Sequence, residues 1–114
     1  MTTIAQARSA LVTLVGASED SIDPPATYVY SSGTDWPGLG GSSVEWEFRV
    51  TVSGGMASNG AASAAVATLL AAKLSALQGS SLYRILRVSP DQMRTIAGGD
   101  QLTADIAVSC KVDI

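Results

Sequence analysis

The chain begins with a segment in which apolar residues recur every three or four positions. From Ile4 to Val15 the apolar side chains fall on one face at the 3.6-residue period of a helix, and polar side chains fall opposite. Thr3 and Gln6 have the spacing of a capping box at the start of this helix, and Gly16 is a natural residue to end it. A second helical pattern covers residues 61–78. Its apolar stripe consists of Val66, Leu69, Leu70, Leu74 and Leu77.

Four other segments predict strands, because they are rich in β-branched and aromatic residues or alternate between apolar and polar residues. They span residues 26–32, 43–52, 82–88 and 101–114. The second and fourth alternate most clearly, so each has one apolar and one polar face. The predicted order is α-β-β-α-β-β. We therefore expect a single α+β domain over residues 1–114, in which a mostly antiparallel four-stranded sheet carries both helices on its apolar face.

The connection between the first two strands is longer than a hairpin needs. Residues 33–41 hold four glycines together with Trp36, Pro37 and Leu39. Two interpretations follow for the tryptophan. The loop reaches away from its own subunit and Trp36 anchors on another chain, or Trp36 folds back and covers an edge of its own core.

The composition suggests a covered surface. Apolar residues make up 46% of the chain and charged residues 15%, against about 25% in a typical soluble domain. Partners that cover the surface explain this shortage, and other copies of the same chain are the commonest case. The alternative is that Ser, Thr and Gly solvate the molecule.

The helix at 61–78 has an unusual reverse side, because its residues are small rather than charged. They are Ala64, Thr68, Ala71, Ala72 and Ser75. Small side chains allow another backbone to approach closely. Lys73 is the single charge in this helix, and it either extends along the apolar stripe to water or forms a salt bridge to a neighbouring subunit.

The residue types exclude most catalytic chemistry. The chain has no histidine, and its one cysteine, Cys110, falls on the apolar face of the last strand. This excludes a disulfide framework, a Cys/His metal site and a nucleophile activated by histidine. Glu45 and Glu47 lie roughly 6–7 Å apart on one strand face, which we interpret as a solvated face rather than a catalytic pair. We expect no enzymatic activity and no cofactor.

Charge and hydropathy limit the classes of partner that the protein can bind and the cellular compartments in which we expect it. The net charge is −3 and the basic residues are scattered along the sequence, which argues against direct nucleic-acid binding. The N-terminal residues do not follow the pattern of a signal peptide, and polar residues interrupt the apolar stretch at 61–77. We therefore expect a protein that is made in the cytoplasm and does not enter a membrane.

The order of these segments resembles that of the tail terminator proteins, also called tail completion proteins, of long-tailed bacteriophages. The resemblance covers nearly the whole chain. Its parts are the short N-terminal helix, YVYSS with its long tip, SVEWEFRVTV, the Ala/Leu-rich helix, RILRVSP, and the ending GGDQLTADIAVSCKVDI. The resemblance implies a small α+β subunit that assembles into a ring, expected to be hexameric. Such a ring sits on the head-proximal end of the tail tube, stops its growth and joins the tail to the head connector.

The resemblance also implies partners and contact residues. The partners are further copies of the chain, the tail-tube protein and the head–tail connector protein, within the tail or neck of the virion. DNA passes through the lumen without specific binding. The expected subunit and tail-tube contacts are Trp36, Pro37, Leu39, Ala64, Ala71 and Lys73. The candidates for the lumen lining are Glu45, Glu47, Arg49, Asp105 and Asp113.

Two other readings remain open at the level of sequence. A head-closure or connector subunit of a phage neck has the same order of elements. A small ligand-binding α+β domain is the second alternative, and a pocket with convergent polar groups would distinguish it.

Overall fold

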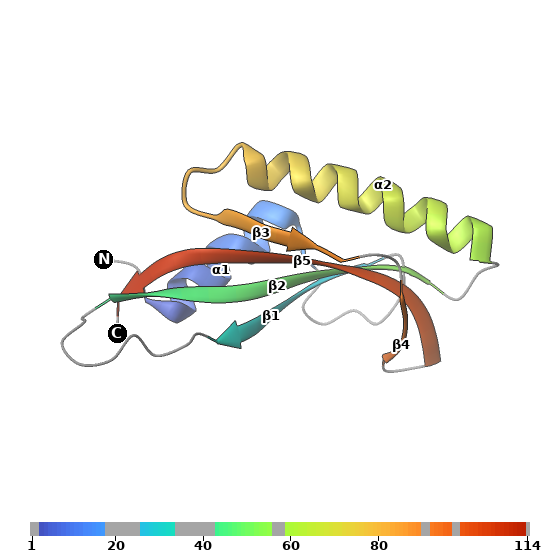
Figure 1. Cartoon of the computed structure of the whole chain (residues 1–114), viewed down its shortest axis with the longest axis horizontal. Coiled ribbons are helices and arrows are strands. Elements are labelled where there is room, and N and C mark those ends of the chain that lie inside the picture. The colour runs from blue at the N-terminus through green and yellow to red at the C-terminus, as the bar shows by residue number, and fades with distance from the viewer. Residues whose placement is uncertain are drawn as a thin grey trace.

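The computed structural model describes residues 3–17, 26–33, 43–55, 59–89, 92–96 and 99–113. Two helices and a set of antiparallel strands follow one another along this part of the chain (Figure 1). They are α1 (Ile4–Val15), β1 (Ala26–Gly33), β2 (Ser43–Gly55), α2 (Asn59–Gln78), β3 (Arg84–Val88), β4 (Gln92–Ile96) and β5 (Gly99–Asp113).

The strands form one sheet in the order β1-β2-β5-β3, with every neighbouring pair antiparallel. The two longest strands, β2 and β5, are paired along most of their length, and Phe48 lies opposite Val108 near the middle. This confirms the predicted α+β fold, with its four-stranded sheet and two helices.

A short further strand, β4, pairs with the beginning of β5, where β5 bends (Figure 1). The sequence predicts only turns in this region, because residues 92–96 lack an extended alternating pattern. Backbone pairing from Gln92 opposite Thr103 to Ile96 opposite Gly99 holds β4 in place. The Thr103 hydroxyl also donates a 3.3 Å hydrogen bond to the carbonyl oxygen of Gln92.

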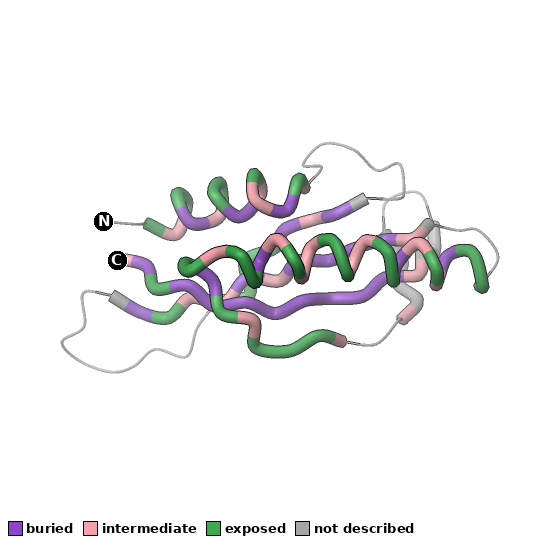
Figure 2. The backbone as a smooth tube through the Cα atoms, turned by 90° about the horizontal axis from the view of Figure 1, so that it is seen from above, coloured by how far each residue is buried: buried purple, intermediate pink, exposed green. Residues whose placement is uncertain are grey.

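Both helices cover the same face of the sheet (Figure 2). Because side chains alternate along a strand, the apolar positions of β2 and β5 all point toward the helices. Phe48, Ile106 and Val108 are fully buried there, packed with Leu11 of α1 and Leu77 of α2. The core therefore lies between the helices and the sheet, and neither described helix covers the opposite face of the sheet.

The ends of α1 are fixed by the local contacts that the sequence predicts. The Gln6 amide donates to the Thr3 hydroxyl at 3.2 Å, and the Thr3 amide donates to the Gln6 side-chain oxygen at 3.0 Å. Gly16 ends the helix at φ +64°, in the left-handed region that favours glycine.

The N-terminal half of α2 lies directly against the backbone of β2. A Cβ atom placed on Gly54 would clash with the Ala62 carbonyl and would lie 2.9 Å from a methyl group of Val66. The register of β2 against β5 shifts between Ser53 and Gly55, so Gly54 lies at a β-bulge-like irregularity in the strand pairing. Only glycine leaves room for the helix at this position.

Candidate functional site

The face of the sheet opposite α1 and α2, which we call the open face, gathers charged side chains from three strands. Residues that lie opposite one another in neighbouring strands share a face, so the pairing places these side chains in rows. Glu45 lies opposite Lys111, and Glu47 lies opposite Ser109, which in turn lies opposite Arg84. In the next row Arg49 and Arg87 flank Ala107 from either side.

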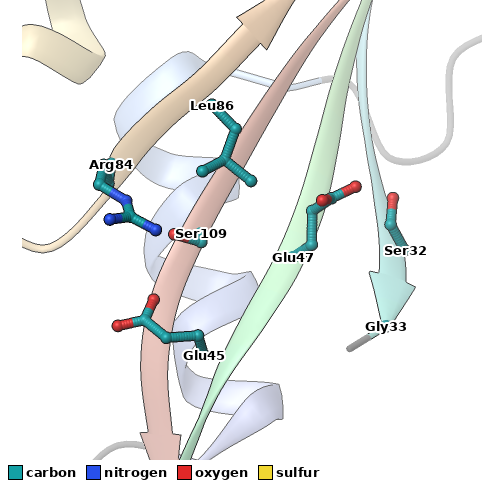
Figure 3. A pocket seen from close by; sticks show the side chains of 7 residues that line it. All are labelled: Ser32, Gly33, Glu45, Glu47, Arg84, Leu86 and Ser109. Atoms are coloured by element: carbon teal, nitrogen blue, oxygen red, sulfur yellow. The ribbon is translucent and has the colours of Figure 1, made fainter. Parts of the chain in front are cut away.

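A groove of about 370 Å³ runs over this face and centres on Ser109 (Figure 3). Its lining residues are Ser32, Gly33, Glu45, Glu47, Arg84, Leu86 and Ser109. Ser109 is only 4% exposed, and its hydroxyl oxygen has no hydrogen-bond partner within the described residues. The groove therefore combines carboxylates, a guanidinium group and a hydroxyl that has unused hydrogen-bonding capacity.

Most charges of the open face have no partner of opposite sign in the described part of the chain. Glu45, Glu47, Arg84, Arg87 and Lys111 make no ion pair there, although opposite charges stand in neighbouring strands. These groups are consequently free to interact with water, ions or another molecule.

Arg49 is held by aromatic stacking on the open face. Its guanidinium lies 5.0 Å from the centre of the Tyr30 ring, a separation typical of a cation–π interaction. Tyr30 in turn packs at 6.4 Å from Tyr28.

The clustering of basic residues on the open face could not be predicted from the sequence. Arg49, Arg84, Arg87 and Lys111 are scattered along the sequence, yet the sheet brings them to one face. The alternation of β2 and β5 assigns Arg49 and Lys111 to the polar face. Arg84 and Arg87 join them only through the pairing of β3 with β5, and an irregularity between Ile85 and Arg87 puts both on the same side.

The predicted lumen-lining residues all belong to the open face, but they differ in exposure. Glu45 is exposed, and Glu47, Arg49 and Asp113 are half-buried. Asp105 is only 8% exposed. Its carboxylate accepts hydrogen bonds from the Thr51 hydroxyl at 2.6 Å and from the Gln92 side-chain amide at 3.4 Å. Asp105 therefore joins β2 and β4 to β5 rather than presenting its charge to solvent.

The outer face of α2 is a second candidate surface. The predicted stripe packs inward, with Val66 and Leu77 fully buried, as the periodicity indicated. The predicted small residues are all exposed: Ala64, Thr68, Ala71, Ala72 and Ser75. Within the described residues, one helical span, Gly60–Gln78, is both long enough and apolar enough to cross a membrane by length and composition. Its mean hydropathy is 1.5. A helix with one face in a core and an uncharged outer face meets the same criterion.

Lys73 is half-buried and its ammonium group lies beside the end of α1. A Cβ atom placed on Gly16 would stand 3.8 Å from the Lys73 nitrogen. A positive charge at a helix C-terminus is favourable because the last carbonyl groups carry partial negative charge. The chain itself thus provides an interaction for Lys73, which is one of the residues expected at an interface.

The predicted contact residues Trp36, Pro37 and Leu39 lie outside the described residues. The strands on either side of that connection are placed, and β1 and β2 form an antiparallel pair as expected.

A second cavity, of about 420 Å³, lies between α1, the residues before β3 and the end of β5. Ala10, Leu82, Tyr83 and Cys110 are among its lining residues. Burial, with a smaller contribution from Cys110, raises the pKa of Tyr83 to about 12. Burial, followed by the Glu45 carboxylate, raises the pKa of the Cys110 thiol above its usual value. Cys110 is therefore a protonated, unreactive thiol, in keeping with its place in the core.

The described residues contain no cluster of three or more His, Cys, Asp or Glu side chains that could hold a metal ion. What they do present is two candidate surfaces: a charged open face with a shallow groove, and an uncharged helix face. Comparisons of the sequence with protein-family models and with curated proteins give no match.

Proposed function

We propose that the protein is a structural subunit of a phage virion, a tail terminator that assembles into a hexameric ring. The ring closes the head-proximal end of the tail tube, stops polymerisation of the tube and joins the tail to the head connector. The protein performs no enzymatic reaction in this role and needs no cofactor.

The observation that carries the proposal is the outer face of α2. A 20-residue helix with Lys73 as its single charge exposes alanines between Ala61 and Ala72. A solvated helix normally places Lys and Glu on that side. Small uncharged side chains suit close packing against a neighbouring subunit, so Ala64 and Ala71 lie in the lateral contact of the ring.

The open face supports the proposal from the opposite side of the subunit. Its solvent-facing charges are nearly balanced, because the Asp105 carboxylate is buried: Glu45, Glu47 and Asp113 stand against Arg49, Arg84, Arg87 and Lys111. A balanced surface gains little from neutralising phosphates, since affinity for DNA grows with the number of phosphates neutralised. Such a face allows DNA to pass through a lumen without being held.

The test uses tail-tube protein that polymerises in solution. Added to growing tubes, the protein should bind the tube ends in negative-stain images and shorten the tubes in proportion to its concentration. Tubes of unchanged length with bare ends would contradict the proposal. A neck or connector subunit would form rings but leave tube growth unchanged. A small ligand-binding domain, which the groove at Ser109 favours, would remain a monomer in solution.

A further inference from the structure

The sheet ends in two strands that each have a partner on one side only. Within the described residues β1 pairs with β2 alone, and β3 pairs with β5 alone. The outer edge of such a strand presents unpaired backbone N–H and C=O groups, which can pair with a strand of another chain. The subunit thus has two edges through which a sheet can continue.

The two edges differ in charge. On the open face β3 carries Arg84 and Arg87. Two apolar residues of β3 are also exposed: Leu86 at 39% and Val88 at 43%. β1 itself contains no charged residue and presents Tyr28 and Tyr30 on the same face. The Val29 carbonyl of β1 accepts a 3.4 Å hydrogen bond from the Arg8 guanidinium of α1. The two strands are therefore different surfaces rather than equivalent ones.

We infer that β3 of one subunit pairs with β1 of a second copy, so that the sheets of neighbouring subunits join edge to edge. The inference rests on the proposed ring and names the strands that form its lateral contact. Pairing of β3 with another β3 would bring arginines of the two copies together, and like charges on paired strands are destabilising. Pairing of β3 with β1 places the arginines beside tyrosine rings instead.

The subunit already contains the interaction that this contact would repeat. Arg49 of β2 lies over Tyr30 of β1 on the open face, 5.0 Å from the ring centre. In the joined sheet, Arg84 and Arg87 would approach the tyrosines from the other side of β1. An arginine over an aromatic ring is favourable even at exposed sites.

The contact uses two different surfaces of the subunit, so it is of the head-to-tail kind, which forms a ring when the rotation between subunits closes. It also unites the two surfaces described above. α1 contacts β1, and α2, which lies mainly over β2 and β5, also contacts β3, so the pairing would bring the β3 side of α2 toward α1 of the next subunit. The open faces would then form one continuous surface around the ring.

Disulfide cross-linking tests the inference. Leu86→Cys supplies a thiol on β3. Tyr28→Cys, Tyr30→Cys and Ser32→Cys supply three thiols along β1, because the register between subunits is to be determined. Opposite residues in paired strands have the Cα separation that a disulfide needs. Each β1 variant is mixed with the β3 variant, oxidised mildly and run on a non-reducing gel.

The expected result is a shift from monomer to a covalent dimer in at least one mixture, reversed by reductant. Each variant alone should stay monomeric on the gel. The wild type controls for the buried Cys110, and Ser9→Cys on the exposed side of α1, mixed with Leu86→Cys, controls for random collision. Light scattering of the same mixtures reports whether oligomers form.

The outcomes separate the inference from the proposed function. A covalent dimer from Leu86→Cys alone would show β3 paired with β3 and would overturn the inference. Rings without a cross-link in any mixture would also overturn it while leaving the proposed ring in place. A specific cross-link in a dimer or filament that never closes would support the strand pairing and contradict the terminator role. A protein that stays monomeric, forms no cross-link and leaves tail-tube ends bare would contradict both.

Discussion

The hydroxyl of Tyr83 donates a 2.7 Å hydrogen bond to the carbonyl oxygen of Ala7, a residue 76 positions earlier in the chain. Tyr83 is 7% exposed and belongs to the main core, just before β3 begins. The bond therefore ties the first helix to the beginning of an edge strand. It links α1 to the strand β3, which is one of the two strands in the proposed ring contact.

Removing this hydroxyl should weaken the subunit without emptying the core. Tyr83→Phe keeps the ring but loses the bond to Ala7, and a typical intramolecular hydrogen bond contributes about 0.5–1.5 kcal/mol. Urea denaturation should show a loss of that size. Tyr30→Phe is the matched control, because its ring is on the surface, and its stability should change little. Equal stabilities of Tyr83→Phe and wild type would contradict the structural role of the bond.

Stability should also fall at alkaline pH in a way that depends on Tyr83. Its pKa is about 12 in the folded protein, against about 10 for an unfolded tyrosine. The folded state holds its proton longer, so the contribution is complete below pH 10 and is lost as the pH rises from 10 to 12. The free energy of unfolding of the wild type should decline over this range. The decline should be shallower in Tyr83→Phe. If the free energies of unfolding of the two proteins fell in parallel with pH, Tyr83 would not be the group responsible.

The close packing of α2 on β2 makes Gly54 sensitive to a single methyl group. Gly54→Ala would drive a Cβ into the Ala62 carbonyl and the Val66 side chain, and overpacking of this kind costs about 1–3 kcal/mol. Gly60→Ala, at the beginning of α2, has open space around it and should leave the stability unchanged or slightly higher. Thermal melting of both variants measures the contrast. A stable Gly54→Ala protein would mean that the helix is not held as closely as described.

The outer face of α2 should govern assembly but not folding. Ala71→Glu adds bulk and a charge to a surface that would be buried between subunits, so it should convert rings to monomers. The isolated subunit should melt within about 0.5 kcal/mol of the wild type, as expected for an exposed site. Ala71→Ser keeps the residue small and should retain rings. If Ala71→Glu assembled normally, the lateral contact would have to lie elsewhere.

Much of the fold could be predicted from periodicity. The helix from Ile4 to Val15, its capping residues and the alternation of β2 follow directly from residue spacing, because burial of one face dictates which positions are apolar. β4 could not be predicted, since its place depends on backbone pairing with β5, which a local residue pattern does not contain. The need for glycine at position 54 could not be predicted from the sequence either, because it depends on how closely α2 packs against β2.

The candidate surfaces were predictable to different degrees. Ala64 and Ala71 could be assigned to an exposed helix face, because the helical period places them opposite Val66 and Leu77. The clustering of Arg84 and Arg87 with Arg49 depends on strand order, which a local pattern does not contain. Asp105 was expected in a lumen because it alternates with apolar residues. Its burial depends on the Thr51 hydroxyl and the Gln92 amide, which arrive from other strands.

The mass of the purified protein in solution, measured by light scattering together with negative-stain images of the same sample, tests the central claim most directly. The proposed function predicts particles of six subunits that appear as rings with a central hole and six-fold symmetry. The expected mass is six times the 11.6 kDa of one chain. A protein that stays monomeric at every concentration and leaves tail-tube ends bare would contradict it.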